Sequence, residues 1–490
     1  MDFRITDKFH LAEEDNVMQP SKNLKQRALI LSGGGALGAY QVGVLKILFE
    51  RLTQEDNEKG ENNRLLFDII AGTSIGAMNG AVLVSQYLET RDWQIAIEQL
   101  KQFWTNEQKG EQKGLASTLS EQDLEKTGGW KVWCEKSNEG KASSTIASVE
   151  AARRYYSVWH YVAKGAPRVH KTLEPRKDLR FFDNPLNEWR PHSSDLLRDT
   201  IQNFVKHPIA TSPEKNEPRL LVFAVDAAQG ETVTFDSFAK ADGSRKSEYG
   251  KYTRERGYEN VIKYDEGINI DHIMASGTLP VFYDYQDVDG HKFWDGGLLS
   301  NTPFREFLQA YHEYWTNVVH NTKEANNILL PELEVYMVNL HPSKRHGLPT
   351  DHDGVKDRLN DIIFGDRSSH FDEMQEFLAL DLQDFAARLK DLSEDAISIL
   401  DRESDKKNEL KKRFEEILAT SSSGKNPNLH PDTYDALLNF RNHYKLAKVV
   451  RIERANHTDA VSNKTGDFSA TTINALITEG MNDAANVSLT

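Results

Sequence analysis

The chain has a single cysteine, Cys134, among its 490 residues. One cysteine cannot form an internal disulfide, and a chain without disulfides is typical of a reducing interior. Residues 1–26 lack the apolar stretch of about 7–15 residues that marks a secretory signal peptide. No window reaches the roughly 20 apolar residues that a membrane-spanning helix needs. We therefore expect a soluble, cytoplasmic protein whose contact with membranes is peripheral.

Basic residues are also fewer than acidic ones. Lys and Arg number 60 against 75 Asp and Glu, which gives a formal net charge of −15. This composition argues against a general nucleic-acid-binding protein, because phosphate contacts need clustered Lys and Arg. It also argues against adsorption of the whole surface to anionic lipid, although a local basic patch can still bind lipid. The hydrophobic fraction of 38% is low for a compact enzyme and indicates polar segments around an ordinary core.

Two strand–turn–helix units follow each other near the start of the chain. Residues 28–31 form an apolar run that ends in a glycine-rich turn, and residues 42–49 then show apolar side chains at helical spacing. Residues 65–70 form a second apolar run that breaks at Gly72 before a second helical pattern. This alternation predicts an α/β fold with a mainly parallel sheet and crossover helices. Further strands are predicted at 220–225, 233–235, 333–338 and 448–452.

The composition divides the chain into parts. Residues 1–26 are predicted to be a flexible tail, and residues 27–345 an α/β domain. Within that domain, residues 106–215 contain Gly-Gly and Gly-Lys loops, several Trp and several Pro, which indicate a helical insertion. Residues 346–490 are predicted to be a charged, mostly helical extension. In it, an apolar stripe over 371–418 predicts a helix that packs one face on the body, or alternatively a partner-binding coiled coil.

The glycine-rich turn at 33–38 is suited to bind negative charge. It precedes a helix, whose first N–H groups are unsatisfied. The spacing of Gly33, Gly35 and Gly38 formally fits a dinucleotide fingerprint, but the acid that would bind the ribose is missing after the second strand. A phosphate-binding P-loop would need Gly-Lys-Ser/Thr, which is absent. The remaining possibility is the developing oxyanion of an ester under attack, which requires a nucleophile nearby.

Ser74 is the candidate nucleophile. Gly72, Ser74 and Gly76 form a G-x-S-x-G pattern between a predicted strand and a predicted helix, the context of a nucleophile elbow. The positive end of the helix that follows favours an alkoxide or oxyanion. The alternative is a tight turn in which Ser74 is a simple helix N-cap.

A serine nucleophile needs a base, and the residues leave two options. Asp295, followed by Gly296 and Gly297, lies on a tight turn after an aromatic run, which suits a side chain that points into a cleft; an ordinary Asp-Gly turn is the alternative. A Ser-Asp/Glu-His triad would need a later histidine. The histidines considered for that role are His312, His320, His341, His346, His352, His370, His430, His443 and His457.

The motifs at 33–43, 72–76 and 295–297, in this order and spacing, resemble those of the patatin-like phospholipases. The segments at 225–235, 274–282 and 298–303 are also similar to that family. The resemblance extends over about residues 27–105 and 180–345. It implies a three-layer α/β/α sandwich with a mainly parallel sheet and makes residues 27–345 the catalytic domain.

The resemblance also implies an activity and the residues that perform it. The family hydrolyses phospholipids or other lipid esters through an acyl-enzyme, without a cofactor. Ser74 would be the nucleophile and Asp295 the general base, with no histidine. The backbone N–H groups of Gly33, Gly34 and Gly35 would form the oxyanion hole. One departure is Leu37, where many members carry Arg or Lys, so the resemblance supports an acyl ester hydrolase more than a phospholipase.

A basic, aromatic segment within the insertion is the candidate lid. From residue 153 to residue 180 there are eight Lys or Arg against two Asp or Glu, and aromatic rings beside cations suit a membrane interface. The alternative is a helix that packs its aromatic residues on the core with the arginines outside. The predicted interface residues are Arg153, Arg154, Tyr155, Tyr156 and Trp159, with Trp130 and Trp133 upstream.

The expected partners are a lipid ester substrate and, transiently, a membrane surface, with no nucleic acid. No metal site is predicted, since the acidic pair around His352 lies in a short loop and is expected to be solvated. An alternative function on the same fold is a lipid-binding or scaffold protein with weak or no catalysis, for which the charged carboxyl-terminal helices are the support.

Overall fold

The structure is a computed structural model. It describes residues 25–61, 64–105, 114–116, 153–161, 165–166, 168–172, 192–253, 256–320, 331–344, 348–349, 352–366, 446–455 and 461–489. Residues 1–24 of the predicted tail, the two tryptophans Trp130 and Trp133, and the striped helix at 371–418 lie outside these residues. The last two residues of the predicted tail, 25 and 26, are instead the start of the first strand.

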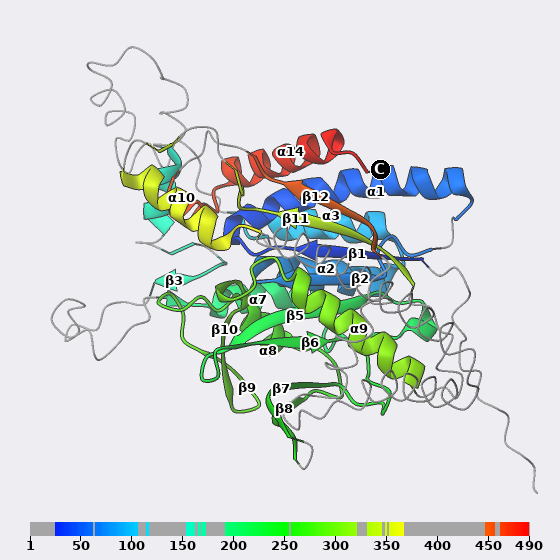
Figure 1. Ribbon diagram of the computed structural model, residues 1–490. Helices are drawn as coiled ribbons and strands as arrows, with labels where there is room; N and C mark the ends of the chain where they lie inside the picture. The colour runs from blue at the N-terminus through cyan, green and yellow to red at the C-terminus, as the bar shows by residue number, and fades with distance from the viewer. Residues whose placement is uncertain are drawn as a thin grey trace, which may run out of the picture.

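An eight-stranded sheet forms the centre of the molecule (Figure 1). Its order is β12-β11-β1-β2-β5-β10-β9, and β6 pairs with β5. All pairs from β12 to β5 are parallel, whereas β10, β9 and β6 are added antiparallel. The strands are β1 (Lys25–Leu31), β2 (Ile69–Thr73), β5 (Arg219–Asp226), β6 (Glu231–Asp236), β9 (Gln286–Val288), β10 (His291–Asp295), β11 (Glu332–Asn339) and β12 (Leu446–Glu453).

Helices cover both faces of this sheet. Because side chains alternate along a strand, β1 supplies both cores: Leu29 and Leu31 face one, and Ala28 and Ile30 face the other. The first core is closed by α1 (Ala39–Lys59), α2 (Ile75–Thr90), α3 (Trp93–Trp104), α8 (Ile270–Gly277) and α14 (Ala470–Asn486), and the second by α9 (Phe304–His320). Figure 1 shows α1 and α14 on one side of the sheet and α9 on the other. The predicted three-layer α/β/α sandwich is confirmed.

The strands predicted after residue 200 are confirmed as β5, β6, β11 and β12. The strand predicted at 65–70 begins later and runs from Ile69 to Thr73. Its start is set by its parallel partner, since pairing with β1 begins at Ala28 opposite Ile69. Residues 65–67 are buried but remain outside the ladder.

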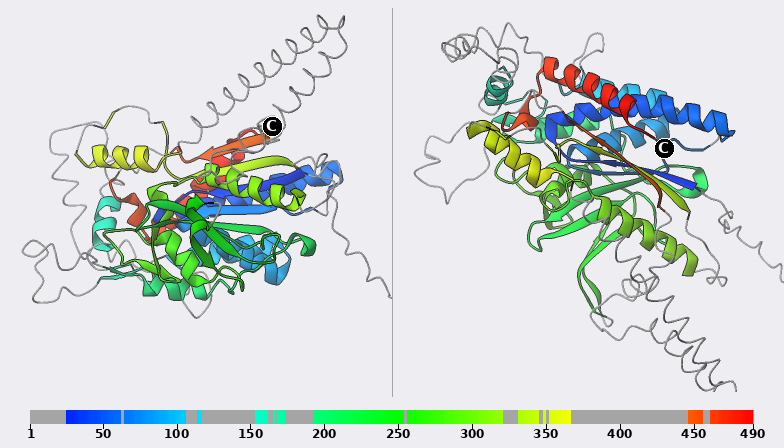
Figure 2. Two further views of the ribbon diagram at one scale, coloured as in Figure 1. Left: turned by 60° about the horizontal axis from the view of Figure 1, so that its bottom comes forward. Right: turned by 45° about the horizontal axis from the view of Figure 1, so that its top comes forward.

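The carboxyl-terminal extension supplies β12 to the edge of the central sheet and α14 to a helical layer (Figure 2). Helix α14 packs closely along α1 because each has a glycine at the contact. A Cβ on Gly43 would lie 1.9 Å from the carbonyl oxygen of Ile477, and one on Gly480 would lie 2.1 Å from that of Tyr40. The described part of the extension therefore contains a strand as well as helices.

The other described elements lie outside the central sheet. They are helices α7 (Asp195–Gln202) and α10 (His352–Phe364), an unlabelled helix at 153–161, the short turns η1 (Gly35–Gly38), η2 (Pro213–Lys215), η3 (Gly296–Leu298) and η6 (Lys464–Gly466), and the two-stranded sheets β3 (Lys171–Thr172) with β4 (His192–Ser193) and β7 (Lys246–Thr253) with β8 (Gly257–Lys263). Among the described residues, no helix has both the length and the apolar character that a bilayer crossing requires.

Candidate active site

The register of three strands brings Ser74 and Asp295 to the same level. Strand β5 lies between β2 and β10, and Thr73 pairs with Phe223 while Asp295 pairs with Ala224. Ser74 follows Thr73 directly, so it stands one residue beyond β2 at the level of Ala224. The two side chains therefore flank the end of β5 and approach each other across it. Ser74 Oγ donates a hydrogen bond of 2.6 Å to Asp295 Oδ2, although 221 positions separate the residues.

Ser74 sits on a strained turn. Its φ of 56° and ψ of −127° are sparsely populated for a non-glycine residue and cost about 1–3 kcal/mol. Small neighbours permit this turn: a Cβ on Gly76 would lie 2.1 Å from the carbonyl oxygen of Leu31, and one on Gly72 would lie 2.4 Å from that of Gly76. The Ser74 N–H donates to Ser276 Oγ at 2.8 Å. The turn presents the hydroxyl at the start of α2, as the predicted elbow requires.

Asp295 is the last residue of β10 and is almost completely buried. Its Oδ1 accepts the N–H of Gly297 at 2.8 Å, which fixes the carboxylate and leaves Oδ2 to Ser74. Burial raises the pKa of Asp295 from 3.8 to about 6, and the hydrogen bonds from Ser74 and Gly297 offset part of this rise. The carboxylate is consequently a stronger base than an exposed aspartate, and it is ionised at neutral pH.

The glycine-rich turn lies next to Ser74, because β1 and β2 are parallel neighbours whose carboxyl ends meet. A Cβ on Gly33 would lie 2.9 Å from Ser74 Cβ. The N–H of Gly33 donates to the carbonyl of Asn301 at 3.1 Å, so this amide is already engaged. For the N–H groups of Gly34 and Gly35, the described part of the chain offers no acceptor. These two amides, rather than all three predicted ones, are available to a ligand.

A buried polar network holds this turn in place. Asn79 Nδ2 donates to the carbonyl of Gly38 at 3.1 Å, and Trp104 Nε1 donates to Asn79 Oδ1 at 2.9 Å. Asn301 Nδ2 donates to the carbonyl of Gly33 at 3.2 Å, which makes the contact between them reciprocal. Sequence reasoning did not identify Asn79, Trp104, Asn301 or Ser276 individually. Ser276 and Asn301 do lie in the family-like segments at 274–282 and 298–303, which is the signal that could have marked them.

Ser74 and Asp295 open into an apolar cavity of about 180 Å³. Its wall contains few polar groups, which is typical of a site for an apolar ligand. The carboxyl-terminal extension forms part of this wall, and Gly35 touches it: a Cβ there would lie 2.4 Å from the carbonyl oxygen of Thr465. Lining residues include Met78, Leu115, Tyr161, Val169, Leu197, Leu279, Phe282, Phe364, Thr465 and Phe468.

The predicted lid arginines lie inside the molecule. Both side chains, on the helix at 153–161, are buried. Arg153 donates to Thr472 Oγ1 at 2.9 Å, and Arg154 Nε lies 3.4 Å from Oδ2 of the fully buried Asp467. The expectation that these arginines contact lipid is wrong, and so is the alternative that they face solvent, because both are buried against the extension: Arg154 pairs with its carboxylate Asp467, and Arg153 hydrogen-bonds to its hydroxyl groups. Trp159, in contrast, is exposed.

The other residues singled out from the sequence differ in their burial. Tyr155 and Tyr156 are half-buried on the same helix, whose Tyr161 lines the cavity. Leu37 is fully buried in the core and does not line the cavity, so no headgroup contact arises there. Among the described residues, no group of three His, Cys, Asp or Glu is placed to hold a metal ion.

Of the histidines considered as the base, His341 lines the cavity. Its Nδ1 lies 3.2 Å from Asp361 Oδ1, and both side chains are buried. Burial lowers the pKa of His341, so the ring is neutral at pH 7, with Nδ1–H donating to Asp361. Its Nε2 lies 3.5 Å from where a Cβ on Gly34 would be. The hydrogen bond from Ser74 goes to Asp295 and not to this ring.

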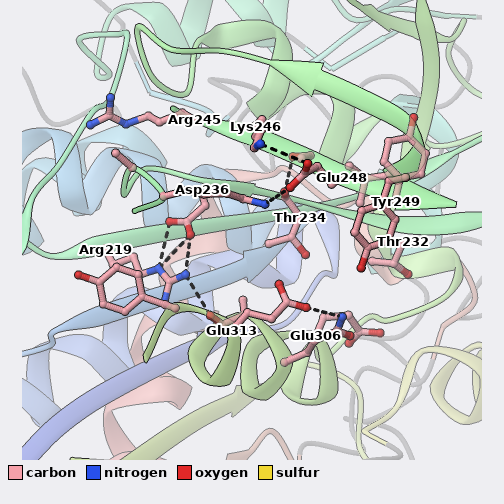
Figure 3. Close-up of a pocket in the computed structure, with 18 of the residues that line it drawn as sticks. Arg219, Thr232, Thr234, Asp236, Arg245, Lys246, Glu248, Tyr249, Glu306 and Glu313 are labelled. Atoms are coloured by element: carbon pink, nitrogen blue, oxygen red, sulfur yellow. Dashed lines mark hydrogen bonds and ion pairs between the residues drawn. The ribbon is translucent and has the colours of Figure 1, made fainter. Parts of the chain in front are cut away.

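A second, larger cavity of about 840 Å³ lies between the β6–β7 region and α9 and shares no residue with the first (Figure 3). Several of its charged groups form ion pairs with one another. Arg219 contacts Asp236 at 2.5 Å, and Glu248 contacts both Lys240 at 2.5 Å and Lys246 at 3.2 Å. Ser212 Oγ donates a hydrogen bond to Glu214 in its wall, but this pair is exposed, whereas Asp295 beside Ser74 is buried. The cavity at Ser74 is therefore the candidate active site.

Two comparisons with known proteins found similarities to this chain. The protein-family model described as patatin-like phospholipase matches residues 29–308, more than half of the chain. Among solved structures, the chain is similar to VipD from Legionella pneumophila at 14% sequence identity and a TM-score of 0.30, over 94% of this chain and 66% of that one. The chain therefore spans slightly less than two thirds of the VipD chain. It matches no curated protein sequence.

Proposed function

Since this chain belongs to the patatin-like phospholipase family, we propose that it is a serine acyl hydrolase of lipid esters, of the phospholipase A, lysophospholipase or lipid esterase type. The observation that carries the proposal is the 2.6 Å hydrogen bond from Ser74 Oγ to Asp295 Oδ2 in the wall of an apolar cavity. The nucleophile and the base touch, and an acyl chain has an apolar space to enter.

In the first half-reaction, Ser74 Oγ attacks the ester carbonyl carbon and its proton passes to Asp295 Oδ2. The negative charge that develops on the carbonyl oxygen is stabilised by the N–H groups of Gly34 and Gly35 and by the positive end of α2. The intermediate expels the alcohol, which takes the proton from Asp295 as it leaves. An acyl ester remains on Ser74.

In the second half-reaction, a water molecule gives a proton to Asp295 and its oxygen attacks the acyl carbonyl. The same two amides hold the oxyanion. The intermediate then releases the fatty acid, and the proton on Asp295 returns to Ser74 Oγ. Asp295 is ionised at the start of each half-reaction, and its raised pKa of about 6 brings its basicity close to the operating pH.

The test is fatty-acid release from a panel of lipid esters: a diacyl phospholipid, a lysophospholipid, a triacylglycerol and a short-chain p-nitrophenyl ester. We expect turnover of at least one lipid ester, and none with the Ser74→Ala variant. Binding of lipid without release of fatty acid from any ester would instead identify a lipid-binding protein on this fold and contradict the proposal.

The role of the glycine turn can be tested by Gly35→Ala. Gly35 has a φ of 53°, and an added Cβ would meet the Thr465 carbonyl, so the turn with its donor amides must shift. We expect kcat on a p-nitrophenyl ester to fall about 100-fold, the typical loss for a misplaced oxyanion donor. Gly60→Ala is the matched control, since its φ of 73° imposes the same backbone cost but nothing lies within 4 Å. Equal kcat values for the two variants would argue against this role.

The His341–Asp361 pair favours a second candidate, a Ser-His-Asp esterase. We expect His341→Gln to keep kcat/KM within about tenfold of the wild type, because Ser74 gives its proton to Asp295. Steady-state kinetics on the p-nitrophenyl ester measures this, with thermal unfolding to show that the variant is folded. A loss as large as that of Ser74→Ala in a folded variant would favour the triad.

A further inference from the structure

Helix α10 is oriented with its acidic side chains inward and its apolar side chains outward. Asp357 and Asp361 are 2% and 1% exposed, whereas Val355, Leu359 and Ile362 are 53%, 54% and 53% exposed. Positions 355, 359 and 362 are spaced four and three residues apart and share one face of the helix. This is the reverse of an ordinary surface helix, which buries its apolar stripe.

The inward orientation is held by specific contacts. Lys464, itself buried, lies 3.1 Å from Asp357 Oδ1 and 2.8 Å from Asp361 Oδ1. Arg358 donates to the carbonyl groups of Pro342 and Ser343 at 3.0 and 2.9 Å. Rotation of α10 to bury its apolar side chains would break these ion pairs and leave charges unpaired in the interior, which is costly. The apolar face is therefore fixed toward the outside.

The helix that carries this face ends at the cavity at Ser74. Phe364, the last residue of α10, lines the cavity. Phe282 lines it as well and is 38% exposed, and its neighbour Val281 is 64% exposed. Trp159 is 49% exposed on the helix at 153–161, which also borders the cavity. Figures 1 and 2 show α10 and the helix at 153–161 at the same end of the molecule.

The charge of the outward face is also distinctive. The exposed residues of α10 include Lys356 but no Asp or Glu, since all three acidic residues of the helix are turned at least partly inward. The chain as a whole has a net charge of −15. A face that is apolar, carries one cation and lacks carboxylates can approach anionic or neutral headgroups without repulsion, as interfacial helices do.

We propose that the outward face of α10, together with the exposed residues Val281 and Phe282, is the surface by which this protein docks on a lipid bilayer. Val355, Leu359 and Ile362 enter the headgroup region, and the cavity at Ser74 then opens toward the acyl chains. This inference rests on the proposed function, which supplies the reason for a lipid surface to lie at this mouth. It moves the membrane contact from the buried arginines to α10.

The experiment compares the wild type with the double variant Leu359→Glu/Ile362→Glu by co-sedimentation with vesicles of phosphatidylcholine, alone or mixed with phosphatidylglycerol. We expect the partition coefficient to fall about 100-fold, because each apolar side chain contributes about tenfold when buried in an apolar phase. The matched control is Ile95→Glu/Val261→Glu, which makes the same charge change at exposed apolar positions, 44% and 38%, away from the cavity. The control should bind vesicles like the wild type.

Two further measurements make the outcome decisive. Turnover of a soluble p-nitrophenyl ester should stay within about twofold of the wild type in both variants, which shows that the fold and the site are intact. Wild-type binding by Leu359→Glu/Ile362→Glu, or a wild type that binds neither vesicle, would overturn the inference. If the wild-type protein by itself sediments as a larger species than this variant, the face contacts a second copy of the chain, and this result would also overturn the inference. Vesicle binding without turnover of any ester would contradict the proposed function alone.

Discussion

Replacing Ser74 with Ala is expected to reduce kcat on a p-nitrophenyl ester by at least about 10⁴-fold. The variant keeps the cavity, the donor amides and Asp295, but it removes the atom that forms the acyl-enzyme. The remaining groups can orient a water molecule at best, and residual catalysis of this kind is small. Removal of the hydroxyl also leaves Asp295 Oδ2 without the hydrogen bond that it accepts at 2.6 Å.

Two measurements establish the cause of that loss. A fluorophosphonate should label the wild type at Ser74 and leave Ser74→Ala unlabelled. Ser85→Ala serves as the control, because Ser85 is also buried in α2 but hydrogen-bonds to the backbone of Lys206 away from the cavity. This control should be labelled and active. Residual kcat above about one hundredth of the wild type in Ser74→Ala would mean that another group is the nucleophile.

Replacing Asp295 with Asn is expected to lower kcat/KM by about 10³–10⁴-fold. The amide has nearly the same shape as the carboxylate but cannot accept the serine proton. Fluorophosphonate labelling of Ser74 should slow in parallel, since the nucleophile is no longer activated. Thermal unfolding provides the control, because the variant is expected to be at least as stable as the wild type at pH 7. A variant that keeps most of its activity would remove Asp295 from the mechanism.

The expected pH dependence follows from the burial of the same carboxyl group. With the pKa raised from 3.8 to about 6, kcat/KM should fall as the pH is lowered through about 6, because the protonated carboxyl cannot act as a base. The contribution of Asp295 to the stability of the folded protein depends on pH in the opposite direction. The native state binds this proton more tightly than the unfolded chain, so Asp295 by itself should lower the free energy of unfolding by about 3 kcal/mol as the pH rises from about 4 to about 6. Asp295→Asn should lack this decrease, which unfolding scans across that range would measure.

The local part of the site was predictable from short segments. The elbow at Ser74 and the glycine turn at 33–38 each lie between one strand and one helix, so their conformation depends on neighbours in the chain. Asp295 was a weaker candidate by itself, because an Asp before two glycines is common in turns. Its partnership with Ser74 came from the family resemblance and is supported by the hydrogen bond between them.

Contacts between segments that are far apart in the sequence were not predictable in this way. Burial of Arg154 depends on Asp467, more than 300 positions away, and Arg153 is buried against Thr472 of the same segment; a basic run in the sequence does not reveal such partners. The orientation of α10 depends on Lys464 in the same manner. The engagement of the Gly33 amide by Asn301 likewise needs the folded chain.

The sequence by itself determined the fold class, the candidate nucleophile and the turn that faces it, since these follow from strand and helix periodicity and from glycines at fixed offsets. Tertiary structure alone decided which amides are available and that residues from the carboxyl-terminal extension, among them Thr465 and Phe468, line the cavity. It also decided that the arginines of the predicted lid lie inside while the apolar face of α10 lies outside. The physical reason is that buried charges are placed by their partners. Those partners come from distant segments, so local composition does not specify which way a charged or apolar face will turn.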